Sequence, residues 1–254
     1  MGTAIMHRLL LSTAALIPCV GLAHDVWVTT DKRPTGVVAV INFGDADKRE
    51  LVDRSRIVDF DLITTAGATD LRKTLSPASA HSFPVLETSA LPPSTGGIIS
   101  VSYDNGFWVT RPGDQKETNT SPLMEPKAIE PHWTVKYGKH LIGPGSYSVP
   151  AKARGELIVT QDPFKLGVGK KLPVTVIIDG KPQPNVRVRY ADGIEALPAE
   201  KIPFVKTNAA GIAEVPLERK GPYLITADPS VAPSHPALSK SDHVYVALSF
   251  DLTQ

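Results

Sequence analysis

The sequence predicts an all-β protein in which two immunoglobulin-like or β-sandwich domains follow a cleaved signal peptide. Twenty-three prolines and nineteen glycines in 254 residues disfavour long helices. Short runs of β-branched and aromatic residues recur along the chain, and clusters of turn residues separate them. This alternation of short strands and turns is typical of antiparallel β-sandwiches.

The first 23 residues have the features of a signal peptide. Arg8 supplies a positive charge, residues 9–22 are almost wholly apolar, and Gly21 and Ala23 provide the small residues that signal peptidase accepts. This apolar stretch is shorter than the roughly 20 residues of a membrane-spanning helix. We therefore expect a periplasmic protein whose mature chain begins at His24 and has no membrane span.

Removal of this leader would leave a chain with balanced charge and no thiol. The only cysteine precedes the cleavage site, so neither a disulfide nor a thiolate metal ligand is expected in the mature chain. Loss of Arg8 from the 27 basic residues leaves 26, which equals the number of acidic residues. A neutral chain without a basic run does not favour a nucleic-acid partner.

An N-terminal β domain is predicted over residues 24–111. The runs that favour strands cover residues 25–30, 37–43, 57–64, 83–88, 98–103 and 106–110. Asn105-Gly106 separates the last two runs, and both residues tolerate positive φ, so this pair predicts a tight hairpin.

Residues 112–154 are predicted to form a linker and a histidine- and tyrosine-containing segment. Prolines and polar residues dominate its first part and give little apolar periodicity. In the segment His132–His140, Trp133 and Tyr137 are four residues apart and could share a helix face. Thr134 equally favours a strand, so the sequence leaves both structures open here.

A C-terminal immunoglobulin-like sandwich is predicted over residues 155–254. Turns such as Asp179-Gly180 and Ala210-Gly211 separate short apolar runs at spacings typical of this fold. The predicted strands cover residues 156–160, 172–178, 185–190, 212–217, 223–227 and 243–252.

No catalytic motif is present in the sequence. It contains no glycine-rich phosphate loop, no Gly-x-Ser-x-Gly elbow and no His-Glu-x-x-His pair. The spacing of serine, histidine and aspartate residues singles out no triad. We therefore expect a protein that is not an enzyme.

Histidines are the residues that could carry chemistry. A mature chain beginning at His24 would present an α-amine and an imidazole that can chelate one metal ion together. Further imidazoles would give a nitrogen-rich site of the kind that transition metals favour. The alternative is that His24 merely follows the cleavage site, since the peptidase selects the residues before the cut.

His132 and His243 are the candidates for these further imidazoles. His132 and His140 are eight residues apart, which places them on one side of either a helix or a strand. We expect His140 to face solvent because a turn follows it, whereas His132 fits a ligand and a packing residue equally well. Asp242 precedes His243 and could orient it, or could simply open a strand at a polar edge.

The chain resembles a domain-of-unknown-function family of exported proteins that are commonly labelled as periplasmic components of cobalt or nickel uptake systems. The start of the mature chain, Ala23-His24-Asp25-Val26-Trp27, is similar to the family's N-terminal motif, although Val26 stands where an aromatic residue is common. Further similar segments are residues 40–44, 132–140, 179–182, 207–211, 221–225 and 246–250.

This resemblance implies a metal-binding accessory protein that supports metal uptake, with a membrane transporter as a further partner. We expect His24, His132 and His243 to bind the ion, with Asp25 or Asp242 as an outer partner. Nickel or cobalt is favoured, and copper or zinc also suits imidazole. The alternatives are a module that binds proteins or glycans without metal, and a copper enzyme that uses the N-terminal histidine.

Overall fold

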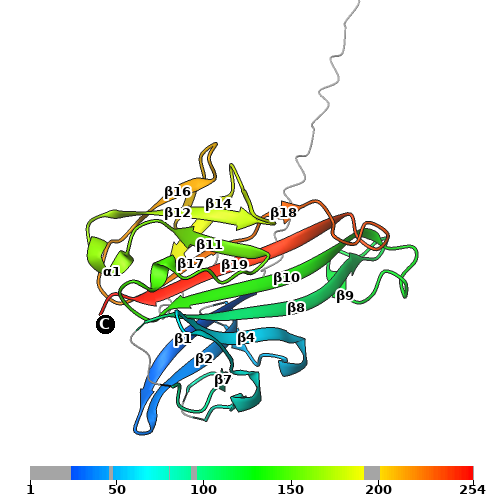
Figure 1. Ribbon diagram of the computed structural model, residues 1–254. Helices are drawn as coiled ribbons and strands as arrows, with labels where there is room; N and C mark the ends of the chain where they lie inside the picture. Colours follow the sequence, from blue (N-terminus) through cyan, green and yellow to red (C-terminus); the bar gives the residue numbers. More distant parts are fainter. Residues whose placement is uncertain (1–23, 46–47, 80, 93–95, 192–200, 254) are drawn as a thin grey trace, which may run out of the picture.

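A computed structural model describes residues 24–45, 48–79, 81–92, 96–191 and 201–253 (Figure 1). The predicted signal peptide lies outside these ranges. Within them, the only α-helix is the single turn α1, Pro163–Leu166, and three short 3-10 helices also occur: η1 (Arg54–Arg56), η2 (Arg72–Thr74) and η3 (Ser146–Ser148). All other regular elements are strands, which confirms the predicted all-β class.

The centre of the molecule is a ten-stranded sheet. Its strand order is β15 (Phe204–Lys206), β14 (Arg187–Ala191), β17 (Pro222–Ala227), β19 (Ser241–Asp251), β10 (Ile129–Leu141), β8 (Ile98–Thr110), β4 (Ile57–Thr64) and β5 (Gly67–Asp70). Two short strands extend it, β18 (Ser230–Val231) beside β19 and β9 (Glu117–Asn119) beside β8. The β10–β19 pair is parallel, and β10 is antiparallel to β8.

Two smaller sheets lie on opposite sides of the long central strands (Figure 1). One contains β1 (Asp25–Arg33), β2 (Gly36–Gly44), β3 (Arg49–Glu50), β6 (Ser76–Pro77) and β7 (Leu86–Glu87). The other contains β11 (Gly155–Val159), β12 (Lys171–Ile178), β13 (Lys181–Pro182) and β16 (Ile212–Pro216).

Each small sheet packs on the central sheet over its own hydrophobic core. Apolar side chains of β1, β2, β4 and β8 form one core, in which Phe60 and Ile41 are fully buried. Alternate residues of β12 face the other core, where they meet Val246 and Phe250 of β19. This period of two is the pattern expected of a strand with one buried face.

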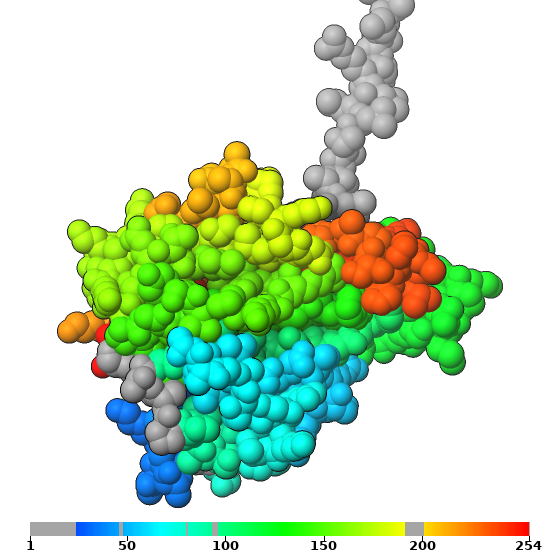
Figure 2. Space-filling model, viewed as in Figure 1, coloured from blue at the N-terminus to red at the C-terminus, as the bar shows by residue number. Residues whose placement is uncertain are grey.

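The central sheet joins the two regions that were predicted to be separate domains. Strands β4 and β8 come from residues 24–111, whereas β17 and β19 come from residues 155–254. Strand β10 lies between them and belongs to the segment 112–154. The undecided His132–His140 segment is therefore a strand, and Figure 2 shows the two halves of the chain in contact along it.

The hairpin predicted at Asn105-Gly106 is wrong, because residues 98–110 form one continuous strand, β8. Thr134 pairs with Gly106 and Val135 pairs with Asp104, so Asn105 is the extra residue of a β-bulge. Gly106 has φ of +75°, and the Asp104 carboxylate accepts a hydrogen bond from its N–H. The positive φ that Gly permits thus makes a bulge here instead of a turn.

A buried ion pair connects β10 to β11, a strand of the four-stranded sheet. Lys139 Nζ donates to Glu156 Oε1, and both side chains are less than one-tenth exposed. We expect Glu156→Gln to lower the free energy of unfolding by about 3 kcal/mol, because it leaves the Lys139 charge buried without its partner. Urea unfolding measures this loss.

The double variant Lys139→Met/Glu156→Leu separates the ion pair from simple packing at these positions. It removes both charges, so we expect it to recover most of the stability that the single variant loses. An equal loss in the single and double variants would show that the charges contribute nothing specific.

Candidate functional site

Polar side chains line one face of the β10–β19 pair. In the parallel register, Thr134 lies opposite His243, Lys136 opposite Tyr245, and His140 opposite Ser249. Residues two apart in a strand share a face, so these side chains form one stripe along the sheet. We call this face the β10–β19 stripe.

Strand β1 crosses over this stripe at Gly138. A Cβ atom on Gly138 would lie 3.1 Å from the Val26 carbonyl oxygen and 3.3 Å from the Trp27 Cα. Ser249 Oγ also donates to the Val28 carbonyl oxygen. The absence of a side chain at Gly138 therefore lets the first residues of β1 rest on β10.

His132 and His243 lie together at one end of the stripe. Their ring centroids are 3.9 Å apart, and the rings stack at 18°. Glu117 of β9 places a carboxylate oxygen 3.8 Å from His132 Nε2. Burial lowers the pKa of His243 to about 4, and the neighbouring His132 acts in the same direction. His243 is therefore neutral near pH 7, which is the form that can bind a metal ion.

His24 is attached to the same stripe through its backbone. Lys136 Nζ donates to the His24 carbonyl oxygen and lies 3.9 Å from the Tyr245 ring centroid. The His24 ring contacts Phe43 edge-on, and its Nδ1 lies 3.5 Å from a Glu50 carboxylate oxygen. Lys136 thus connects the predicted mature N-terminus to the strand that carries His132.

Asp25 belongs to a group of charges around Lys136 that also includes Arg189 and Asp228. Burial raises the pKa of Asp25 and lowers that of Lys136. Attraction between the two groups opposes both shifts, and Arg189 also favours the charged carboxylate. Asp25 is therefore one of several charges that influence each other around Lys136.

Asp242 lies on the opposite face of β19 from His243, because successive residues of a strand alternate. Its carboxylate is fully buried and accepts hydrogen bonds from Ser234 N and Ser234 Oγ. Arg154 Nη1 lies 2.8 Å from the same oxygen. The structure therefore separates Asp242 from the ring it was predicted to orient.

His140 is buried, so the prediction that it faces solvent is wrong. Ser249 Oγ–H donates to the Val28 carbonyl oxygen, so His140 Nδ1–H must donate to Ser249 Oγ, 2.9 Å away. This tautomer leaves Nε2 to accept from Thr30 Oγ1, at 3.2 Å. Eight residues of strand, about 26 Å, separate His140 from His132, so the two cannot share an ion.

Burial of His140 makes stability depend on pH. Burial lowers its pKa from 6.5 to about 4, and attraction from Asp251 only partly opposes this. Between those values the unfolded chain takes up a proton that the folded chain does not, so stability falls as pH falls. We expect His140→Asn to reduce the stability difference between pH 8 and pH 5 by about 2 kcal/mol in urea unfolding.

The pKa of His243 is also lowered, so protonation of both histidines destabilises the wild-type protein as the pH falls. The comparison of wild type with His140→Asn isolates one of them. An unchanged pH dependence in the variant would mean that the pKa of His140 is the same in the folded and the unfolded protein.

The remaining histidines have partners away from the stripe. His81 Nε2 lies 3.0 Å from Arg33 Nη2 and 3.5 Å from an Asp31 oxygen. His235 packs edge-on against Trp133, with ring centroids 4.7 Å apart. Within the described ranges, no three or more His, Cys, Asp or Glu side chains lie close enough to hold a metal ion.

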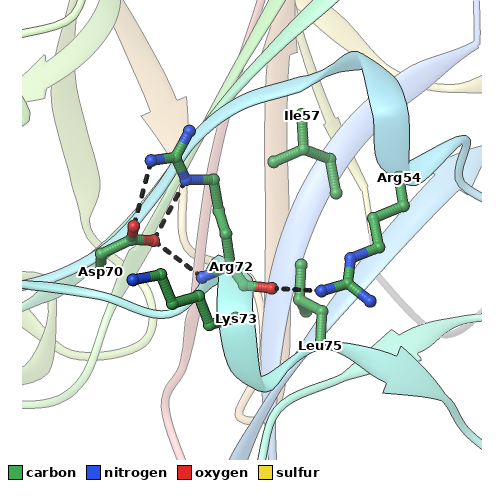
Figure 3. A pocket seen from close by; sticks show the side chains of 6 residues that line it. All are labelled: Arg54, Ile57, Asp70, Arg72, Lys73 and Leu75. Carbon is green, nitrogen blue, oxygen red and sulfur yellow. Dashed lines mark hydrogen bonds and ion pairs between the residues drawn. The ribbon is translucent and has the colours of Figure 1, made fainter.

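A second polar feature lies at η1 and η2, where a cavity of about 250 Å³ is lined by basic side chains (Figure 3). Arg72 pairs with Asp70 at 3.0 Å, and Arg54 Nη2 donates to the Arg72 carbonyl oxygen. Figure 3 shows these contacts within the wall of the cavity. They hold η2 against β5 and η1.

Lys136 is the residue of this site that the sequence reasoning missed. It lies at even spacing between His132 and His140, so a strand prediction for this segment would have placed all three on one face. The helix alternative gives the same grouping, because positions 132, 136 and 140 also share a helix face. The signal for burial was weak, because lysine is rarely buried.

Comparisons with known proteins give a family but no activity. The family model described as Domain of unknown function (DUF4198) matches residues 22–230. No curated protein sequence matches the chain. In the part of the chain that the structure describes, no helix is long and apolar enough to cross a membrane.

Solved structures resemble the chain only remotely. Native alpha-2-macroglobulin from Escherichia coli, spanning domains MG0-NIE-MG1, is 13% identical, with 91% of this chain and 72% of that chain covered and a TM-score of 0.25. The titin domains z1z2 in complex with telethonin are 10% identical, with 90% and 89% covered and a TM-score of 0.18. Dimeric latent PorU from Porphyromonas gingivalis is 12% identical, with 88% and 20% covered and a TM-score of 0.18.

Proposed function

The chain belongs to the DUF4198 family, and we propose that it is a periplasmic accessory protein that binds a divalent transition-metal ion and supports its uptake. Binding and delivery, without chemical turnover, is the proposed activity. The observation that carries the proposal is the contact between His132 and His243, which are 111 positions apart in the sequence yet stack at 3.9 Å.

The two imidazoles of His132 and His243 form the proposed half-site, and the Glu117 carboxylate lies beside it. His132 comes from β10, His243 from β19 and Glu117 from β9, so three strands of the central sheet position them. Imidazole nitrogen suits nickel, cobalt, copper and zinc. The resemblance to exported proteins labelled as cobalt or nickel uptake components is the reason for placing nickel and cobalt first.

The remaining ligands are proposed to come from the mature N-terminus. Cleavage after Ala23 would give His24 a free α-amine, a ligand that the precursor lacks. Lys136 Nζ holds the His24 carbonyl oxygen, and Lys136 follows Thr134, the partner of His243, by two residues along β10. The proposal requires the His24 amine to move from this position to the histidine pair when the ion binds.

Metal loading requires the two stacked rings to move apart. The nitrogen lone pair of an imidazole lies in the plane of its ring, so one ion cannot lie in the planes of two nearly parallel rings. His243 is only partly buried and can rotate more readily than His132, which is buried. We propose that rotation of the His243 side chain converts the stacked pair into a chelating pair.

Isothermal titration of Ni(II), Co(II), Cu(II) and Zn(II) into the mature chain starting at His24 tests this function. The matched control carries one additional alanine before His24, which moves the amine without changing any side chain. We expect one stoichiometric site in the mature chain and clearly weaker binding in the extended chain.

Equal binding by the two chains would remove the N-terminal amine from the site while leaving the histidine pair. Absence of stoichiometric binding in both would overturn the metal proposal. The alternative of a protein- or glycan-binding module would then have to be tested with those ligands.

A further inference from the structure

The cavity at η1 and η2 combines exposed charged side chains with an apolar floor. Ile57 and Leu75 are buried and form the floor, whereas the four charged lining residues are exposed. The complete lining is Arg54, Ile57, Asp70, Arg72, Lys73 and Leu75 (Figure 3). None of these residues belongs to the proposed metal site, so the cavity is a separate feature of the molecule.

Two of the charged residues, Arg72 and Asp70, neutralise each other. Arg72 Nε and Nη2 donate to the two Asp70 carboxylate oxygens at 3.1 and 3.0 Å, and Nη1 donates to the Val58 carbonyl oxygen. These bonds from Arg72 lower the pKa of Asp70, so its carboxylate stays ionised. Each guanidinium nitrogen of Arg72 therefore already has an acceptor, and the pair forms a neutral part of the wall.

Arg54 and Lys73 supply charge that the fold leaves available. Arg54 Nη2 donates to the Arg72 carbonyl oxygen at 3.0 Å, while Arg54 Nε and Nη1 have no acceptor among the described residues. Within the same part of the chain, neither Arg54 nor Lys73 forms an ion pair, although the neighbouring Arg72 does. Because the Arg72–Asp70 pair is neutral, the lining carries a net charge of +2.

The size and charge of the cavity suit a compact dianion. Its volume of about 250 Å³ is smaller than the roughly 300–1,000 Å³ of sites for drug-sized molecules. Figure 3 shows Arg54 and Lys73 on different sides of the cavity, with Leu75 between them. A phosphate monoester carries about −1.5 to −2 near neutral pH and has three acceptor oxygens, whereas a carboxylate carries only one charge. Guanidinium and ammonium groups both form strong, charge-assisted hydrogen bonds to phosphate.

We propose that this cavity binds the phosphate group of a phosphate monoester. Arg54 donates to the phosphate through the nitrogens that the fold leaves unused, and the Lys73 ammonium group neutralises the second negative charge. Ile57 and Leu75 contact the apolar part of the ligand next to the phosphate. This assignment is independent of metal binding, since it uses none of the proposed metal ligands.

Phenyl phosphate and benzoate test the proposal on the metal-free mature chain. The two probes share one aromatic ring, but benzoate carries a single negative charge. We expect phenyl phosphate to cause saturable amide chemical-shift changes that centre on η1 and η2 in ¹H–¹⁵N NMR spectra. Benzoate should bind at least about fivefold more weakly, as expected for loss of one partly exposed charge interaction.

Vesicles distinguish a lipid headgroup from a soluble phosphate ester. Phosphatidic acid has a phosphate-monoester headgroup, and phosphatidylcholine does not. Co-sedimentation of the mature chain with vesicles that contain phosphatidic acid, but not with pure phosphatidylcholine vesicles, would assign the site to a lipid. Binding of phenyl phosphate without any vesicle binding would assign it to a soluble ester, and either result agrees with the proposal.

Three substitutions change the charge of the cavity in opposite directions. Arg54→Gln and Lys73→Gln each remove one positive charge, so we expect each to weaken phenyl phosphate binding about fivefold. Asp70→Asn releases the Arg72 guanidinium and should strengthen binding by a similar factor. Lys127→Gln is the matched control, because Lys127 is an exposed lysine that does not line the cavity. It should leave binding unchanged.

Absence of saturable shifts at η1 and η2 with phenyl phosphate would overturn the proposal. Equal affinities for benzoate and phenyl phosphate would overturn the assignment of a phosphate group. Equal weakening by Lys73→Gln and Lys127→Gln would also contradict it, because the anion would then respond only to the overall charge of the protein.

Discussion

His243→Ala is expected to weaken Ni(II) binding by the mature chain about 100-fold or more. Loss of groups that only orient a metal ligand already costs about 10- to 100-fold, and loss of a ligand costs at least as much. His132→Ala should have a comparable effect, because the two rings form one pair. Isothermal titration of Ni(II) into each variant measures the change.

His81→Ala is the matched control for this prediction. His81 contacts Arg33 and Asp31 near the His140 end of the stripe, opposite the end that carries His132 and His243, so we expect its removal to leave Ni(II) affinity unchanged. Circular dichroism of each variant verifies that the fold is retained. If all three histidine variants bound Ni(II) as the wild type does, the pair would be a packing contact only.

Gly138→Val is expected to lower the free energy of unfolding by about 3 kcal/mol, because overpacking of a tightly packed site forces backbone shifts. A Cβ atom at this position would already lie 2.8 Å from Val101 Cγ1, as well as close to the β1 backbone. Gly138→Ala should cost less, because it adds only the first of these atoms. Urea unfolding of both variants measures the two losses in the free energy of unfolding.

Gly138→Val should also weaken the packing of β1 on the stripe. The His24 backbone, which Lys136 holds, should then become more mobile. Limited proteolysis of the mature chain is expected to cut near its N-terminus faster in Gly138→Val than in wild type. Lys171→Val, an exposed position of β12, serves as the control and should change stability by less than about 0.5 kcal/mol. A Gly138→Val variant as stable as wild type would mean that β1 does not pack on β10 at this residue.

Most strands could be predicted from the sequence, because they combine β-branched residues with clear turn signals. The predicted strands at 57–64 and 172–178 agree with β4 and β12 to within one residue at each end. The turn at Asp179-Gly180 is likewise where β12 ends, with positive φ at both residues. Such local signals do not depend on the rest of the fold.

Strand β10 could not be predicted with the same ease. It contains lysine, histidine and glycine at positions that are buried in the folded protein, such as Lys136 and His140. Tertiary contacts with β1 and β19 satisfy these groups, and no local pattern reveals those contacts. Asn105-Gly106 illustrates the same limit, because a positive φ serves a bulge as well as a hairpin.

The candidate site was only partly predictable for a related reason. The contact between His132 and His243 depends on the parallel register of β10 and β19, which joins distant parts of the chain. The separation of Asp242 from His243, in contrast, follows from strand alternation and could have been foreseen. Alternation within a strand is readable from sequence, whereas register between remote strands is not.

Anomalous diffraction at the nickel absorption edge, from crystals of the mature chain grown with NiCl₂, tests the proposed function most directly. We predict one strong peak about 2.0–2.2 Å from ring nitrogens of His132 and His243, with the His24 amine as a further ligand. Nickel bound only at other residues, or no ordered nickel at all, would contradict the account.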